Sequence, residues 1–307
     1  MKKNLESLFG SFANPRIVDR HEQGLYEFEV HPGNVGKNRK RGGITMALEL
    51  NLQGKTAVIT GASEGIGRAI AYQFAKEGIN LRLSARRRDK LEEVKENCRK
   101  NYGVDVEVYP LDLGKSAGQM ELFRQTRDVD ILVNNAGAIP KGKIHEIDEA
   151  QWRQVWDLKV FGYINLCREY YGFMKDRGDG VIINIIGNGG EKPVSDYIAG
   201  STGNAALMAF TRALGGDSPN DGIRVVGLNP GPVSTEKLVS MMKKAALDKW
   251  GDEGRYREFY QPFAFDRVAT PEEIAAMAVF LASPLSAYTS GTIVTVDGGM
   301  VNKGPLF

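Results

Sequence analysis

From residue 54 onward, short apolar runs alternate with longer stretches in which apolar residues recur at helical spacing. The apolar runs have strand length and lack the polar alternation of a half-exposed strand. Such repeated strand–helix units are typical of a parallel sheet that is covered by helices on both faces. We therefore predict an α/β fold, a Rossmann-type doubly wound seven-stranded parallel sheet. The predicted strands span residues 56–60, 80–85, 104–109, 130–133, 181–186, 223–229 and 292–296, and the clearest helical stretches span 67–77, 91–101, 152–175 and 204–214.

The first 45 residues differ from the rest of the chain. They carry eight Lys or Arg residues and five acids, and they show no sustained period of a helix or a strand. We predict that residues 1–45 form a disordered extension and that residues 46–307 form one dinucleotide-binding domain. Two alternatives stay open: the segment is a basic docking arm, or translation starts at Met46.

The overall composition narrows the classes of partner and the cellular location. The formal net charge is +2, and no apolar run is long enough to cross a membrane. We therefore expect no nucleic-acid partner and no membrane partner. Cys98 and Cys167 lie far apart without metal-ligand spacing, so we expect thiols in a reducing compartment, the cytoplasm, and no metal site.

The run that follows the first predicted strand is rich in glycine and opens a helix. It reads Thr60-Gly61-Ala62-Ser63-Glu64-Gly65-Ile66-Gly67. The first glycine permits a tight turn, the second lets the backbone approach a pyrophosphate, and the third lets helix and strand pack closely. The amides at the start of the helix then face the phosphates. This context predicts a dinucleotide site whose contacts include Gly61, Ser63, Gly65, Ile66 and Gly67.

The end of the second predicted strand bears on the choice of cofactor. Ala85 stands where an NAD site usually has an acid, and Arg86 follows it. A guanidinium suits a 2′-phosphate, so we predict NADP(H) in preference to NAD(H). Against this, Glu64 adds a negative charge nearby, and the arginines could simply be a solvated helix start. Asp112, after the third strand, is a candidate acceptor for the adenine amine.

Several ordered motifs give the chain, from about residue 50 to 300, a resemblance to the short-chain dehydrogenases/reductases. Besides the glycine loop they are Asn134-Asn135-Ala136-Gly137, Tyr197 at the start of a long helix, and the segment 229–235, with Ser290-Gly291 and Asp297-Gly298-Gly299 near the end. The resemblance implies that Asn135, Ala136 and Gly137 border the adenine ribose. It also implies that Pro230, Gly231, Val233 and Thr235 lie against the nicotinamide.

The resemblance breaks at the catalytic positions. Members of the family use a tyrosine as acid or base, a lysine four residues later that binds the ribose, a serine, and an asparagine on the preceding helix. Tyr197 matches the tyrosine. Ser201 stands four residues later and could bind ribose, but it brings no charge. The serine position aligns with Gly187, where the neighbouring Asn188 is either a donor to a carbonyl or a turn residue.

Lys159 stands where the family has its asparagine. A nearby cation lowers the pKa of a tyrosine, and lysine has a long, flexible stem. We therefore predict that Lys159 replaces the missing lysine as the partner of Tyr197. The alternative is an ordinary surface lysine on an amphipathic helix.

The function implied by these residues is an NADP(H)-dependent oxidoreductase that interconverts a carbonyl and an alcohol. Two alternatives remain, a non-catalytic dinucleotide-binding protein and a lyase or epimerase of similar fold. Residues 236–266 contain many Met and aromatic side chains, which form either a partly apolar substrate lid or a packing core. We also expect a homodimer or a homotetramer, as is common in the family.

Overall fold

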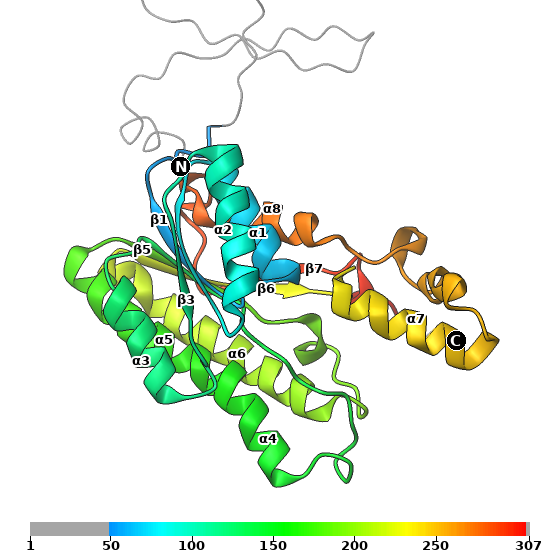
Figure 1. Cartoon of the computed structure of the whole chain (residues 1–307). Helices are drawn as coiled ribbons and strands as arrows, with labels where there is room; N and C mark the ends of the chain where they lie inside the picture. The colour runs from blue at the N-terminus through cyan, green and yellow to red at the C-terminus, as the bar shows by residue number, and fades with distance from the viewer. Residues whose placement is uncertain (1–48, 305–307) are drawn as a thin grey trace, which may run out of the picture. The chain divides into compact units, whose positions relative to one another are not determined.

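The chain folds around a twisted sheet with helices on both sides (Figure 1). The computed structural model describes residues 49–304, and in this range seven parallel strands pair in the order β3-β2-β1-β4-β5-β6-β7. The predicted Rossmann-type sheet is therefore confirmed. The strands are β1 (Thr56–Thr60), β2 (Asn80–Ala85), β3 (Val106–Pro110), β4 (Ile131–Asn134), β5 (Gly180–Ile185), β6 (Ile223–Pro230) and β7 (Ile293–Val296).

Two groups of helices cover the two faces of the sheet (Figure 1). One face carries α1 (Gly65–Lys76), α2 (Arg88–Tyr102) and α8 (Pro271–Ala282). The other face carries α3 (Ser116–Thr126), α5 (Gly162–Arg177) and α6 (Ile198–Asp217), and α4 (Glu149–Trp156) packs against the start of α6. A further helix, α7 (Glu236–Trp250), follows the end of β6.

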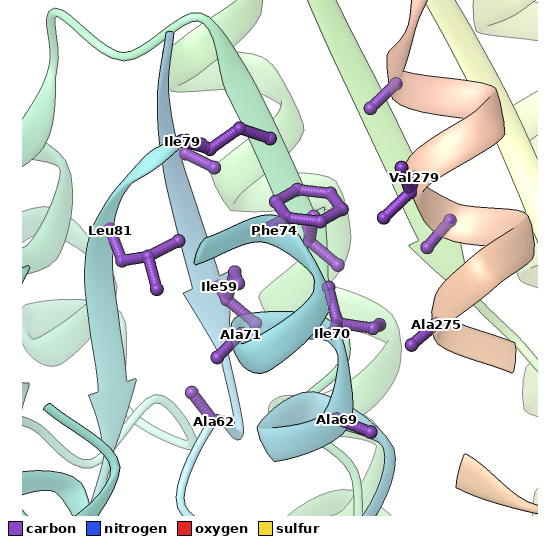
Figure 2. Close-up of a cluster of buried hydrophobic side chains, with 14 of the residues drawn as sticks. Ile59, Ala62, Ala69, Ile70, Ala71, Phe74, Ile79, Leu81, Ala275 and Val279 are labelled. Atoms are coloured by element: carbon purple, nitrogen blue, oxygen red, sulfur yellow. The ribbon is translucent and has the colours of Figure 1, made fainter. Parts of the chain in front are cut away.

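The core on the first face holds α1 against the sheet. Figure 2 shows Ile70 and Phe74 of α1 between Ile59 of β1, Leu81 of β2 and Val279 of α8. Ile70 and Phe74 are fully buried, and each such side chain contributes about 1.5–3 kcal/mol by leaving water. This packing fixes the N-terminus of α1 beside the carboxyl end of β1.

The order of the strands creates a crevice at one edge of the sheet. β1 pairs with β2 on one side and with β4 on the other, so the chain moves outward to β3 and then returns across β1. Open α/β sheets bind ligands at the carboxyl ends of the strands where this reversal occurs. The crevice between the turns after β1 and β4 is therefore the expected ligand site.

The predicted helix over residues 152–175 is interrupted. α4 ends at Trp156, a π-helical turn spans Asp157–Phe161, and α5 begins at Gly162. Such π-helical turns are rare and occur frequently at functional sites. Lys159 lies inside this turn, which changes the direction of its side chain relative to a regular helix.

The predicted strands match the observed ones within two residues at each end, but α6 starts at Ile198, earlier than its periodic pattern indicates. The predicted disorder of residues 1–45 lies outside the described residues. From residue 49 to residue 304, no helix is both long and apolar enough to cross a membrane.

Candidate active site

A deep cleft of about 1490 Å³ opens at the carboxyl ends of the central strands. Every residue predicted to bind the cofactor lines this cleft, with the exception of Gly67. Of the predicted catalytic residues, Tyr197, Lys159 and Asn188 line it, and Ser201 does not. The fold thus brings together motifs that are up to about 170 residues apart in the sequence.

The glycine loop is shaped by close backbone contacts. Gly61 and Gly65 adopt positive φ angles of 65° and 55°, which side-chain-bearing residues rarely adopt. A Cβ atom on Gly67 would lie 2.3 Å from the carbonyl oxygen of Gly61, so this position packs helix against loop and does not face the cleft. The Asn135 amide donates hydrogen bonds to the carbonyl oxygens of Thr60 and Gly61. Asn135 therefore holds the loop in shape.

The N-terminus of α1 suits an anion. The Glu64 side chain does not cap this helix, and the carboxylate of Glu236 instead accepts a hydrogen bond from the backbone amide of Gly65. Beside it, Arg68 of α1 forms an ion pair with Glu236 at the start of α7. The start of α1 thus binds an anionic group, a place that the Glu236 carboxylate takes here and that the pyrophosphate of a dinucleotide fits.

The far end of the cleft carries the basic residues of the β2–α2 turn. Glu64 forms an ion pair with Arg87, which neutralises the acid that counted against a 2′-phosphate. Arg86 is exposed, lines the cleft and has no ion pair within residues 49–304. Asp112 also lines the cleft, and its Oδ1 accepts a hydrogen bond from the amide of Gly114.

The opposite end of the cleft is built by β6 and the turn after it. Thr235 caps α7, because its hydroxyl accepts a hydrogen bond from the amide of Leu238. Asn188 donates a hydrogen bond to Asp297 Oδ2, at 3.2 Å, and its amide nitrogen also lies 3.6 Å from Met300 Sδ. Asn188 therefore anchors the C-terminal turn, and the structure gives no support to its role as a donor to a substrate carbonyl.

Tyr197 lies at the N-cap of α6, and its ring folds back over the first turn of the helix. A Cβ atom on Gly200 would lie only 2.0 Å from Cζ of this ring. The phenol therefore fills the space that a side chain at position 200 would take. Burial raises the pKa of Tyr197 above its usual 10, so the phenol is protonated at neutral pH.

Lys159 extends from its π-helical turn to the end of β5. Its Nζ donates a hydrogen bond of 2.6 Å to the carbonyl oxygen of Ile186, and its stem crosses Gly137, where a Cβ would lie 2.8 Å from Cδ. Burial lowers the pKa of this ammonium from 10.5 to about 8. Lys159 is thus not a surface lysine. Within the described part of the chain, however, no hydrogen bond joins it to Tyr197.

Comparisons with known proteins agree with this geometry. Residues 55–246 match the model of the short chain dehydrogenase family. The chain belongs to the short-chain dehydrogenase/reductase family. The predicted enzyme class, an oxidoreductase that acts on CH–OH groups with NAD(P), is therefore confirmed.

Individual relatives cover nearly the whole described region. The uncharacterized oxidoreductase YvaG of Bacillus subtilis is 31% identical over 83% of this chain and 99% of its own length. Galactitol 2-dehydrogenase (L-tagatose-forming) of Cereibacter sphaeroides is 32% identical over 81% and 95%. The crystal structure of L-sorbose reductase from Gluconobacter frateurii, complexed with NADPH and L-sorbose, superposes with a TM-score of 0.80 at 35% identity, covering 84% of this chain and 100% of that one.

Ser201 does not take the place of the lysine of this family. It is buried, lies outside the cleft, and its hydroxyl accepts a hydrogen bond from the amide of Val194. Helical spacing placed it near Tyr197, but Tyr197 is a cap residue with non-helical angles, φ −136° and ψ 36°. The register counted from Tyr197 therefore does not apply, and Ser201 has no catalytic role in the mechanism proposed below.

Asn204 is a cleft residue to which the sequence assigned no role. It is 3% exposed, lines the cleft, and its Nδ2 lies 3.0 Å from the position of a Cβ on Gly187. Its place one turn after Gly200 is visible in the sequence. What could not be seen there is that the Tyr197 ring lies over Gly200, so that Asn204 rather than Ser201 lines the cleft.

The buried ammonium of Lys159 predicts a specific dependence of stability on pH. Between pH 8 and 10.5 the folded state has released this proton and the unfolded state still holds it, so the free energy of unfolding rises with pH in this window. Lys159→Met removes this contribution. The stability of the variant relative to wild type should therefore fall by roughly 2–3 kcal/mol from pH 7 to pH 10, at about 1.36 kcal/mol per pKa unit. Urea unfolding at several pH values measures it, and a constant difference would contradict the burial of the charge.

The position of the Tyr197 ring can be tested through Gly200. Gly200→Ala should gain helix propensity but force the ring aside, so we expect a lower melting temperature and a loss of turnover of about tenfold or more. Gly216→Ala is the matched control, because Gly216 lies on the same helix, is exposed and has open space around a Cβ. The control should keep full turnover and melt no lower than wild type. Unchanged turnover in Gly200→Ala would show that the ring lies elsewhere.

Proposed function

We propose that the protein is an NADP(H)-dependent reductase of a carbonyl compound, with Tyr197 as the proton donor and Lys159 as its electrostatic partner. The observation that carries this proposal is that both side chains line one cleft. All but one of the predicted cofactor-binding residues line the same cleft. A nicotinamide, when bound, supplies the hydride. The chain itself must bind and orient the substrate, deliver one proton and stabilise the charge that this leaves.

The preference for NADP(H) is supported by the charges around Arg86. Because Glu64 is paired with Arg87, the exposed guanidinium of Arg86 is left to form charge-assisted hydrogen bonds with a 2′-phosphate. The similar L-sorbose reductase was crystallised with NADPH. Asp112 is retained as the proposed acceptor for the adenine amine.

The protonation state of the cleft supports reduction as the direction. The raised pKa of Tyr197 keeps its phenol protonated at neutral pH, ready to donate to a carbonyl oxygen as hydride reaches the carbonyl carbon. The donation leaves a phenolate. Our proposal assigns the Lys159 ammonium, which lines the same cleft, to stabilise that phenolate and so lower the barrier. Solvent then returns a proton to the tyrosine.

The substrate side of the cleft is partly apolar. Leu238, Met241, Met242 and Phe263 line it, whereas Trp250 and Phe259 stack on each other with ring centroids 4.7 Å apart. The segment 236–266 is thus divided between lining the cleft and packing on itself. Lys141, Lys192 and Lys237 also line the cleft. We infer that the substrate is a small carbonyl compound with both apolar and polar parts.

The expected homodimer or homotetramer remains a proposal.

The experiment that tests the function combines cofactor binding with turnover. Purified protein is titrated with NADPH and NADH by fluorescence, and a panel of ketoses and apolar ketones is screened for NADPH consumption. Tyr197→Phe and Lys159→Met should each lower kcat roughly a hundredfold or more while NADPH still binds. Near-normal turnover in Lys159→Met would remove its proposed role. Binding without turnover over the whole panel would instead favour a non-catalytic sensor or scaffold, in keeping with the absence of a Lys159–Tyr197 hydrogen bond among residues 49–304.

The role of Arg86 is tested separately. Arg86→Ala should weaken NADPH binding about tenfold or more and leave NADH binding nearly unchanged, because only NADPH carries the 2′-phosphate. Arg88→Ala is the control, since Arg88 lies two residues on, pairs with Glu92 and does not line the cleft. Equal losses for both cofactors, or equal effects of both variants, would argue against a phosphate contact at Arg86.

A further inference from the structure

Gly200 and Asn204 lie one helical turn apart on α6. Asn204 lines the cleft, and Gly200 lies beneath the Tyr197 ring, which also lines it. The Tyr197 ring fills the side-chain space of Gly200, and Asn204 follows at the spacing at which members of this family have their tyrosine and lysine. Asn204 also meets Gly187, which stands at the serine position. The spacing of Gly200 and Asn204 thus matches that of the family's tyrosine and lysine, with the phenol supplied from position 197.

The environment of Asn204 is that of a ligand-binding amide. Asn204 is only 3% exposed to solvent, and its Oδ1 has no hydrogen-bond partner among the described residues. A buried acceptor without a donor costs roughly 1–3 kcal/mol. Two further buried atoms share this state, Ser84 Oγ and Asn134 Oδ1, but neither residue lines the cleft. Among these three residues, Asn204 is thus the one that lines the cleft.

We propose that lysine and asparagine have exchanged places across this cleft, so that Asn204 binds a hydroxyl group of the bound ligand while Lys159 supplies the cation. In the family the asparagine is on the helix before and the lysine on the helix of the tyrosine. Here Lys159 is on the former and Asn204 on the latter. The inference rests on the proposed function for the role of Lys159, whereas the hydroxyl-binding role of Asn204 rests on its own geometry.

A hydroxyl is the group that suits this amide. Asn204 Oδ1 needs a donor, and its Nδ2, which lies 3.0 Å from the position of a Cβ on Gly187, is an N–H donor that needs an acceptor. A hydroxyl can serve both atoms, whereas a carbonyl or phosphate oxygen would leave Oδ1 unpaired. Two sources carry such a group, the nicotinamide ribose and a hydroxylated substrate. The ribose is the expected one, because the residue at this place in the family binds it.

Asn204→Leu keeps the approximate shape of the side chain and removes its hydrogen-bonding atoms. Ligand-free protein should melt at the same or a higher temperature, because an unpaired acceptor is gone, yet NADPH should bind about three- to tenfold more weakly. If the hydroxyl belongs to the substrate, the Kd for NADPH stays constant and the KM for a hydroxylated substrate rises instead. If both constants stay at the wild-type values, the hydroxyl-binding role is refuted.

A matched control separates binding from structure. Thr211 is also buried on α6, but it is outside the cleft, and it accepts a hydrogen bond from Asn184 Nδ2. Thr211→Val should therefore lower the melting temperature and leave the Kd for NADPH unchanged. If the melting temperature of Asn204→Leu falls as much as that of Thr211→Val, with no change in Kd or KM, Asn204 stabilises the core and binds no ligand.

The exchange itself is tested by reversing it. Lys159→Asn should lose turnover. The double variant Lys159→Asn/Asn204→Lys should have a kcat at least about tenfold higher than that of Lys159→Asn, because α6 then supplies the cation to the cleft. No recovery in a double variant that still binds NADPH would overturn the exchange. If wild-type protein turns over no carbonyl but Asn204→Leu still weakens NADPH binding, the proposed function fails and the role of Asn204 stands.

Discussion

The contact on which the catalytic end of the cleft depends is the hydrogen bond from the buried Lys159 ammonium to the carbonyl oxygen of Ile186. It requires three local features at once: a π-helical turn that directs the lysine inward, a glycine at position 137 that lets its stem pass, and the end of β5 with an open carbonyl. Burial of this charge is unfavourable, as the lowered pKa shows. A buried cation that lowers the stability of the fold is consistent with the catalytic role that we propose for Lys159.

The dinucleotide half of the site follows from local rules. A strand, a glycine loop and a helix that come in sequence must place the helix amides at the end of the strand. The sequence alone was therefore enough to place Gly61 and Gly65 in the cleft. The sheet itself follows from the alternation of apolar runs, and its predicted strands lie within two residues of the observed ones. Even Glu64, an apparent objection to NADP(H), is neutralised by Arg87, a partner only the fold reveals.

The catalytic half could be predicted only in part, because its register is set by tertiary contacts. Counting four residues from Tyr197 gives Ser201, but Tyr197 caps the helix and folds over Gly200, so the face toward the cleft continues to Asn204. Ser201 instead accepts a hydrogen bond from Val194. Asn188 was assigned from its neighbour Gly187, yet its amide is held by Asp297, 109 residues away. Lys159 was found because the expected asparagine was missing at that position.

The central claim is that Lys159, displaced to the neighbouring helix, serves Tyr197. A crystal structure of the NADPH complex tests it most directly, through the distances from Lys159 Nζ to Tyr197 Oη and from Asn204 Oδ1 to the ribose. We predict Nζ within about 4–6 Å of Oη, the range over which a charge shifts a pKa, and a hydrogen bond of about 3 Å between Asn204 and a ribose hydroxyl. A complex in which Lys159 stays on Ile186, out of that range of Oη, with Asn204 Oδ1 still unpaired, would contradict it.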